Sequence, residues 1–431
     1  MAIADKERTG RAAVIGLDGV PVDLLERFAK DGTMPAMGRL VGEGHLHRMK
    51  ASLPEISSVS WTNFMTGVDP GRHGVFGFTD LHERSYRLRF PNFNDVKAPT
   101  IWDRLGETGR KSIVINQPSS YPARKIEGAL VAGFVAVELA KAVYPLSHLA
   151  PLEKMGYQID IDTLKARQDQ AFMWRELDRT LEGGRLAFEY FWPQEWDFFE
   201  LVVTGTDRLH HYLWNALDDP SHPAHEGFVD YYRKVDALID RIATAYRQKN
   251  GGLGGLYLLS DHGFGAIEQE VFLNAWLEKA GFLTFDSPKP ERLLDIGPGS
   301  RAFAMDPNRI YVNLKGKYPR GVVQPADKQA VKAEISAALM QLEYGGRKVV
   351  REVFDTEAIY SGPYVAKGPD LIALAHNGFD MKGSVDRKEI FSRSDLQGMH
   401  TWDDAFFWAD SDRGADLTIT DLAAIIMENF Q

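Results

Sequence analysis

The sequence predicts an α/β fold: a doubly wound, mostly parallel sheet flanked by helices. Short apolar runs that are typical of buried strands alternate with helix-like segments through most of the chain. Several of these runs end in Asp or Asp-His, at the sheet edge where α/β proteins bind ligands. The 431 residues, 44% of them hydrophobic, can form one large core. We expect a single domain over 1–431 with cap insertions at 80–99, 136–180 and 284–308.

The first third of the chain begins with a strand at residues 12–19 (AAVIGLDG), an apolar run that ends in Asp-Gly. A helix follows with apolar residues at helical spacing, and Gly32 is its expected C-cap. A second helix starts at Pro35. Further on, the pattern predicts a helix at 100–109 and buried strands at 111–118 and 129–134.

The rest of the chain continues the alternation. Residues 163–184 are helix-like and could cover the core or form a cap, and 228–248 form the clearest amphipathic helix. A strand and a helix close the chain. The other expected strands are 195–207, 257–265, 309–314 and 370–375, with a helix between the last two.

Composition excludes several classes of protein. A net charge of −10 argues against binding nucleic acid through a basic surface. There are no cysteines, so disulfides and thiolate metal sites are excluded. The start, MAIADKERTGR, lacks the long apolar run of a signal peptide, and no stretch predicts a membrane helix. We expect a cytoplasmic protein with no membrane partner.

Four hydroxyl residues gather at the start of a short helical run: Ser57, Ser58, Ser60 and Thr62. Such residues are favoured as helix N-caps for structural reasons alone. The same position brings a hydroxyl nucleophile close to free backbone N–H groups. The stretch by itself is compatible with both interpretations.

Metal-type residues lie at four predicted strand ends, after three strands and just before the last one. They are Asp18, Asp207, the Asp261–His262 pair and His400. Each alone has an ordinary explanation, since a strand-end Asp often caps a helix and an Asp-His pair or a lone His is often solvated. Together they place carboxylates and imidazoles at one sheet edge.

A further imidazole at His211 lies four residues after Asp207, so on a helix both side chains share one face. The adjacent His210 is the alternative ligand. The other histidines lack a comparable setting, with His73 the least certain among them. Six such groups suit two divalent ions about 3.5–4 Å apart. Mixed Asp/His ligation suits Zn²⁺, and the ligand types also admit Mn²⁺ or Fe.

At this point the pattern resembles the alkaline phosphatase superfamily, especially its type I phosphodiesterase/nucleotide pyrophosphatase branch and the bacterial phosphohydrolase and phosphomutase relatives. The pieces that carry the resemblance occur in the family's order and span nearly the whole chain. They are VIGLDG (14–19), SSVSWTNFMTGVDPGRHGVFGF (57–78), TGTDRLHHYLW (204–214), LLSDHGFG (258–265) and GMHTWDDAFF (398–407).

The resemblance implies a role for each matching residue. One metal ion would be held by Asp18, Asp261 and His262 together with the oxygen of Ser57, and the other by Asp207, His211 and His400. Counting back from the family's Thr66–Gly67 pair selects Ser57 as the nucleophile, and the DxxxH spacing selects His211 over His210. Ser57 would form a covalent phospho-enzyme intermediate that water then hydrolyses.

This sequence departs from its relatives at two positions. Ser58 stands where classical alkaline phosphatases have a phosphate-clamping Arg, which disfavours an efficient phosphomonoesterase. Ser60 stands where eukaryotic nucleotide pyrophosphatases have an Asn, which leaves the nucleotide contacts open. No sulfatase-type C-x-P-x-R motif is present. The candidates for stacking on a substrate ring, each equally readable as a core aromatic, are Trp61, Phe78, Tyr121 and Trp214.

The resemblance therefore implies a metal-dependent phosphoric-ester hydrolase with two divalent ions, acting on small phosphodiesters or pyrophosphates. The alternatives within the superfamily are a phosphomonoesterase, a phosphomutase and a phosphonate hydrolase. A non-catalytic binding module is the remote alternative, and it is disfavoured because every expected ligand is present. The sequence fixes neither the natural substrate nor the oligomeric state.

Overall fold

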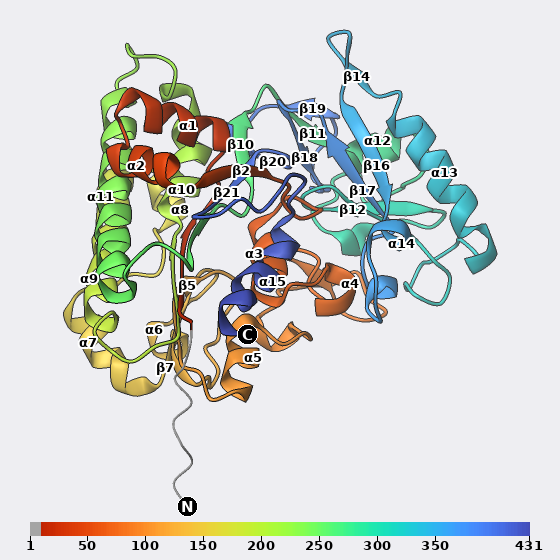
Figure 1. Cartoon of the computed structure of the whole chain (residues 1–431). Helices are drawn as coiled ribbons and strands as arrows, with labels where there is room; N and C mark the ends of the chain where they lie inside the picture. Colours follow the sequence, from red (N-terminus) through yellow and green to blue (C-terminus); the bar gives the residue numbers. More distant parts are fainter. Residues whose placement is uncertain (1–9) are drawn as a thin grey trace, which may run out of the picture.

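An eight-stranded sheet runs through the larger part of the computed structural model, which describes residues 10–431 (Figure 1). The strand order is β2-β21-β9-β1-β8-β5-β6-β7. Its strands are β1 (Ala12–Leu17), β2 (His45–Met49), β5 (Ser112–Gln117), β6 (Gly128–Ala132), β7 (Val143–Tyr144), β8 (Phe198–Val203), β9 (Leu256–Leu259) and β21 (Ala405–Ala409).

The five central strands, β9 to β6, are all parallel, and antiparallel pairs lie at both ends. β21 is antiparallel to β9 and to β2, and β7 is antiparallel to β6. The central strands are buried on both faces and therefore read as continuous apolar runs in the sequence. The predicted α/β class, with a mostly parallel sheet, is confirmed.

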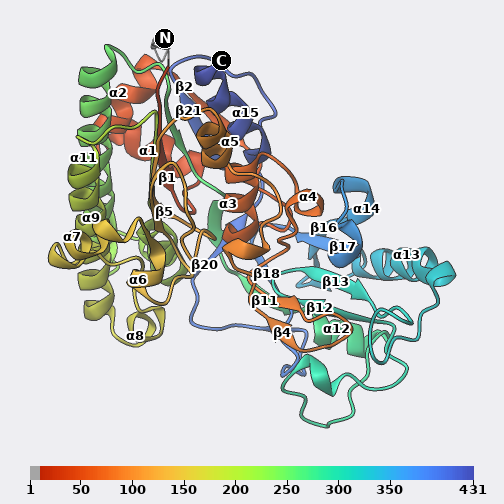
Figure 2. The ribbon, with the colours of Figure 1, turned by 90° about the horizontal axis from the view of Figure 1, so that it is seen from below.

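Helices cover both faces of this sheet, as Figure 2 shows. Successive strand residues point to opposite sides, so Ile113 and Ile115 belong to one hydrophobic core and Val114 to the other. The first face carries α1 (Val22–Asp31), α2 (Pro35–Glu43), α9 (Gln170–Phe191), α10 (Gly205–Leu213) and α11 (His225–Asn250). The second face carries α3 (Ser57–Thr66), α5 (Ile101–Glu107) and α15 (Leu422–Met427).

Most predicted helices and strands are present with small changes at their ends, but the strand expected at 257–265 is divided into β9 and β10 (Gly263–Ala266), which belong to different sheets, and the last residues of the strand expected at 195–207 begin α10. Gly32 closes α1 in the left-handed conformation, as expected of a C-cap. The helix-like stretch at 163–184 covers the core, because Met173, Leu177 and Leu181 of α9 are buried against the sheet. The stretch begins with α8 (Thr163–Gln168), and α6 (Leu139–Ala142) and α7 (Leu149–Lys154) precede it.

Residues 269–392 form a second lobe with its own hydrophobic core (Figure 1). The strands expected at 309–314 and 370–375 are present here, in an antiparallel sheet of order β12-β13-β17-β16. Its strands are β12 (Ala302–Met305), β13 (Arg309–Val312), β16 (Val350–Asp355) and β17 (Leu371–Ala375). A three-stranded sheet joins β11 (Gln269–Phe272), β18 (Phe379–Lys382) and β19 (Phe391–Ser392), and the lobe's helices are α12 (Leu273–Lys279), α13 (Lys328–Leu339) and α14 (Thr356–Ile359).

Smaller elements connect the core to this lobe. β10 (Gly263–Ala266) pairs with β20 (Gly398–Thr401). The 80–99 segment holds the hairpin of β3 (Asp80–Leu81) and β4 (Leu88–Arg89), and Tyr86 between them packs edge-on against Phe303 of the lobe. The remaining short elements are α4 (Pro70–His73), β14 (Glu343–Tyr344) and β15 (Arg347–Lys348). Among residues 10–431, no helix is long and apolar enough to cross a membrane.

The start of the chain, residues 1–9, on which the expected lack of a signal peptide depends, lies outside the described residues. The division into one domain with insertions stays a prediction. We propose to treat the second lobe as an insertion into the alkaline phosphatase-like core, since β21 and α15, which follow it in sequence, return to the main sheet and its covering layer.

Glu200 is a carboxyl group in the middle of the main sheet. It lies on β8 between Val14 and Val114 of the neighbouring strands and is fully buried. Within the part of the chain that the structure describes, neither carboxyl oxygen has a hydrogen-bond partner. Burial raises the pKa of Glu200 to about 8.

Glu200 should therefore make the folded state less stable as the pH rises. Above the unfolded pKa of 4.5 the folded state retains a proton that the unfolded chain releases, so stability falls until the pH passes the folded value. Between pH 6 and pH 9 we expect the wild type to lose about 3 kcal/mol from this group. Urea unfolding at the two pH values measures the loss, which Glu200→Gln should remove. An equal loss in both proteins would contradict the assignment.

Candidate active site and metal centre

The carboxyl ends of three adjacent strands carry the predicted acidic residues. Asp18 directly follows β1, Asp261 follows β9, and Asp207 lies in the first turn of α10 after β8. All three are buried. The loops are tied together: the Thr206 hydroxyl donates to the Asp18 carbonyl at 2.6 Å, and the Gly19 N–H donates to Asp261 Oδ1 at 3.0 Å. These bonds bring the carboxylates to one edge of the sheet.

The first cluster joins Asp18, Asp261, His262 and Ser57. His262 Nε2 lies 3.6 Å from Asp18 Oδ1 and 3.2 Å from Asp261 Oδ2. Ser57 Oγ lies 3.0 Å from the same nitrogen and 3.4 Å from Asp18 Oδ1. The Ser57 hydroxyl therefore lies next to the ring nitrogen of His262 and the carboxylate of Asp18.

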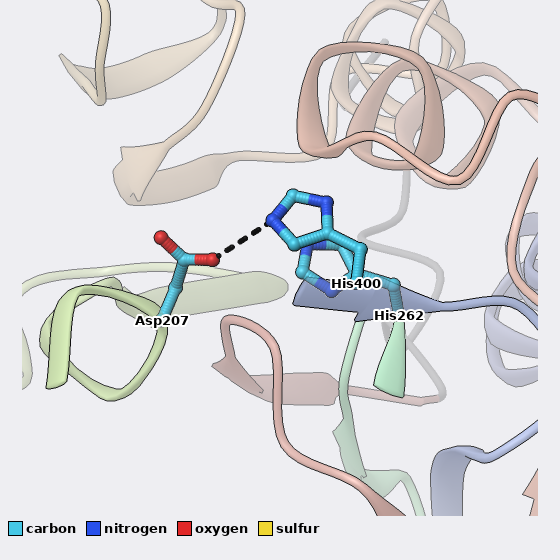
Figure 3. Close-up of side chains that lie close together, drawn as sticks. All are labelled: Asp207, His262 and His400. Atoms are coloured by element: carbon cyan, nitrogen blue, oxygen red, sulfur yellow. Dashed lines mark ion pairs between the residues drawn. The ribbon is translucent and has the colours of Figure 1, made fainter. Parts of the chain in front are cut away.

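The second cluster joins Asp207, His211 and His400. Asp207 Oδ1 lies 3.4 Å from His211 Nε2 and 3.2 Å from His400 Nε2, the ion pair that Figure 3 marks. The ligand sets implied by the resemblance assign His262 only to the first cluster. Its nitrogen also lies within 4.8 Å of the ligand atoms of Asp207 and His400, and its ring stacks on His400 at 3.6 Å between centroids (Figure 3). His262 therefore lies where the two clusters meet.

All three histidines are oriented in the same way. The Nδ1–H of each donates to a backbone carbonyl, at 2.9–3.0 Å. The accepting carbonyls belong to Gly398 for His211, Gly263 for His262 and Glu55 for His400. In the neutral rings each Nε2 is then an acceptor that faces the centre, the arrangement typical of metal-ligating histidines.

These acceptors require positive charge between them. The Nε2 atoms of His211 and His400 face each other at only 3.1 Å, and in the neutral rings neither carries a proton to donate. Three buried carboxylate oxygens, Asp18 Oδ2, Asp207 Oδ1 and Asp261 Oδ2, have no hydrogen-bond partner among residues 10–431. Divalent cations satisfy both conditions, so the residues fit the two ions inferred from the sequence.

The charges of the three carboxylates differ because their neighbours differ. Burial and the charge of Asp261 raise the pKa of Asp18 well above its usual range. Burial also raises the pKa of Asp261, to about 6. Burial acts on Asp207 in the same direction, but His211 and Arg208 hold its pKa well below the usual range. The Asp18 side of the site therefore has the greater need of a bound cation.

A family model described as type I phosphodiesterase / nucleotide pyrophosphatase matches residues 12–403, which covers both clusters. The chain belongs to this family. Its members depend on metal ions, typically two, and the two clusters fit that requirement. A search of curated proteins found no match.

Solved structures share the fold of this phosphodiesterase-family chain. One is phosphonoacetate hydrolase from Sinorhizobium meliloti 1021 in complex with phosphonoacetate, with a TM-score of 0.65, 14% identity and coverage of 98% of this chain and 96% of that one. Another is an inactive form of murine ectonucleotide pyrophosphatase / phosphodiesterase 5 in complex with AMP, with a TM-score of 0.57, 12% identity and coverage of 98% and 95%. Both support an alkaline phosphatase-like fold.

The hydroxyl residues of α3 have different surroundings. Ile56, not a Ser or Thr, is the N-cap, and no side chain caps this helix end. Ser60 Oγ bonds Ser52 Oγ at 2.7 Å, whereas the buried Ser58 Oγ has no partner within the described part of the chain. The capping interpretation therefore fails for this helix, and the Ser57 hydroxyl lies beside His262.

Arg208 is a site residue that sequence reasoning missed. Its guanidinium donates to Asp207 Oδ2 at 2.6 Å and to both carboxylate oxygens of Asp160, at 2.7–3.2 Å. The Arg208 guanidinium holds Asp207 in place, so that Asp207 Oδ1 faces His211 and His400. The position of Arg208, directly after the candidate ligand Asp207, could have indicated that it belongs to the site. Its second partner, Asp160, lies in the 136–180 segment, where no sequence pattern indicated a site residue.

The two doubtful histidines have structural roles. Both ring nitrogens of His210 are used, with Nδ1 donating to the Gly19 carbonyl at 2.8 Å and Nε2 accepting from Tyr232 at 2.7 Å. His73 Nε2 donates to Asn63 at 2.8 Å, and its Nδ1 accepts a backbone N–H. Burial lowers the pKa of each to about 3, so both are neutral. His211 is the residue of the pair whose Nε2 reaches Asp207.

The four aromatic candidates divide into two pairs. Trp61 is fully buried in the core beneath α3, and Trp214 packs on Phe264 and His210. Phe78 and Tyr121, in contrast, line a cavity of about 390 Å³ beside Ser58. Only the second pair has a place from which to contact a substrate of the family.

Loss of His262 should affect both ions, because its nitrogen belongs to both clusters. We expect purified protein to bind two divalent ions per chain. His262→Ala should weaken both by more than about 100-fold, whereas His211→Ala should weaken mainly one. Metal analysis after dialysis against graded chelator measures this. The exposed His45, changed to Ala, is the matched control, and two tightly held ions in His262→Ala would contradict the geometry.

Proposed function

We propose that the protein is a two-metal phosphodiester or pyrophosphate hydrolase in which Ser57 is the nucleophile. The observation that carries this is the position of Ser57 Oγ, 3.0 Å from His262 Nε2 at the uncapped start of α3. A hydroxyl so placed can attack phosphorus while backbone N–H groups of the helix start receive the phosphoryl oxygens. The Ser57 ester formed would then be hydrolysed by water.

The proposed ligand sets are those implied by the family. Asp18, Asp261 and His262 would hold one ion with Ser57, and Asp207, His211 and His400 would hold the other. Zn²⁺ is the ion we propose, with Mn²⁺ or Fe as alternatives, because the donors are carboxylates and imidazoles. Bound ions would lower the pKa of the nucleophile and stabilise charge on the attacking and leaving oxygens.

The preference for diesters rests on the cavity beside Ser58. None of its lining residues is an Arg or Lys. Its walls are mostly apolar and include Phe78, Phe90 and Tyr121. A monoester carries one more negative charge than a diester and benefits most from a cationic clamp. An uncharged group esterified to the phosphate suits these walls better.

A phosphonate hydrolase is the second candidate, favoured by the structural likeness to phosphonoacetate hydrolase. A panel of a diester, a monoester, a phosphonate and a nucleotide sugar, run on metal-analysed protein, separates these functions. Product analysis with added alcohols tests the phosphomutase alternative. We also propose that the substrate is a small-molecule phosphate ester and that the protein is cytoplasmic.

Replacement of the proposed nucleophile gives the sharpest test of the mechanism. Ser57→Ala should lower kcat on bis(4-nitrophenyl) phosphate by at least about 1,000-fold, because no covalent intermediate can form. Its content of metal should stay close to two ions per chain. Ser60→Ala is the matched control, since Ser60 bonds only Ser52 and the backbone around it. Full activity in metal-loaded Ser57→Ala would end the nucleophile assignment.

Introducing an Arg at position 58, where classical alkaline phosphatases have a phosphate-clamping Arg, should change the preference between monoesters and diesters. Ser58→Arg places a guanidinium in the cavity beside the nucleophile and should raise the monoester-to-diester ratio of kcat/KM by about tenfold. Ser58→Gln, long and polar but uncharged, should leave that ratio near its wild-type value. Steady-state kinetics on 4-nitrophenyl phosphate and its diester measure the ratio. An equal rise in both variants would show that charge is not the cause.

A further inference from the structure

A second cavity lies on the other side of the metal centre, between the core and the second lobe. It has a volume of about 300 Å³. His211 and His400 form its inner wall. The second lobe contributes the loop after β12 and strand β18, and Phe78 stands between this cavity and the apolar one beside Ser58. One cavity therefore adjoins His211 and His400, and the other adjoins Ser58, the neighbour of Ser57, with Phe78 in the wall of both.

The geometry assigns the two cavities to opposite ends of the substrate, an assignment that rests on the proposed function. In an in-line displacement the attacking and leaving oxygens lie on opposite sides of phosphorus. Ser57 attacks from the cluster of Asp18 and His262. The leaving oxygen therefore departs toward the other cluster, where His211 and His400 line the second cavity. That cavity is where the leaving group lies.

The charges in the second cavity are predominantly negative. Its lining contains Glu55, Asp306 and Asp380 but only one Lys or Arg, Lys382. Lys382 is already paired with Asp380, at 2.5 Å. Glu55 and Asp306 have no ion-pair partner within residues 10–431; Glu55 accepts from the Asn308 amide at 3.0–3.1 Å, and Asp306 from the Gly383 N–H at 2.6 Å.

Asn308 provides a second, independent indication of a ligand. It lies in the wall of the cavity, and only 1% of it is exposed. Its Nδ2 donates to Glu55, while its Oδ1 has no hydrogen-bond partner among the described residues. A buried acceptor of this kind costs free energy unless a donor reaches it. The cavity is therefore rich in acceptors and poor in donors.

We propose that the leaving group is a small cationic alcohol that carries N–H donors, an amino alcohol by chemical class. Its ammonium group would meet the unpaired carboxylates of Glu55 and Asp306, donate to Asn308 Oδ1, and lie near the rings of Phe78 and Phe379. A pyrophosphate leaving group would bring negative charge against those carboxylates. The inference narrows the proposed function to diesters with a cationic leaving group.

Monoesters of phenylphosphonic acid test this, because only one oxygen can leave and the phenyl group suits the apolar cavity. The three esters to compare are the 2-aminoethyl, 2-hydroxyethyl and 2-carboxyethyl esters, whose terminal groups are cationic, neutral and anionic. Chromatography of released phenylphosphonate gives kcat/KM for each. We expect the wild type to favour the aminoethyl over the carboxyethyl ester by at least about tenfold.

Two variants of the cavity should shift this aminoethyl-to-carboxyethyl ratio in opposite directions. Asp380→Asn removes a negative charge and frees Lys382, so the ratio should fall by about tenfold, and Lys382→Met should raise it. Opposite shifts cannot come from general damage to the fold. Glu26→Gln, an exposed residue on α1, is the control for total charge and should not move the ratio.

The results separate the inference from the function on which it rests. Turnover of bis(4-nitrophenyl) phosphate without a preference for the aminoethyl ester, or with both variants shifting the ratio in one direction, overturns the leaving-group assignment alone. Failure to hydrolyse that diester and all three esters overturns the proposed function and the inference with it. A wild-type preference with opposite shifts in the variants supports both.

Discussion

Mutual repulsion among buried carboxylates is the constraint on which this structure depends. The ligand atoms of Asp18 and Asp261 lie within 4.8 Å of each other at a dry sheet edge. Two like charges about 4 Å apart cost about 4 kcal/mol at an effective dielectric constant of 20. Hydrogen bonds from Gly19 to Asp261 and from Arg208 to Asp207 hold two of the three carboxylates in place. The result is a centre prepared for cations before they bind.

Much of this arrangement could be predicted from the sequence, because its causes are local. Buried parallel strands such as β1 and β8 are mostly apolar, and a candidate metal-binding Asp follows each of them. The amphipathic pattern of α11 and the glycine after α1 are equally local signals. The seven site residues came from motif order, and the structure brings them to one place.

Other features could not be predicted, since their causes lie far apart in the chain. β2 has the polar sequence HLHRM and becomes a strand only because β21, more than 350 residues later, pairs with it. The same holds for the separate sheet of the second lobe, whose strands look like those of the core. Asn308 bonds Glu55 across 253 positions, and no pattern within either segment shows that contact.

The helix that carries Ser57 also affects how the protein can change. Every residue of α3 is buried, so its start has no freedom to adjust to different ligands. Part of the lining of the second cavity comes instead from the second lobe, namely the loop after β12 and strand β18. Substitutions in the lobe can alter the lining of the cavity while the Ser57 hydroxyl keeps its place. The chain therefore places the hydroxyl and part of the adjoining cavity on separate lobes, each of which can be altered without changing the other's core.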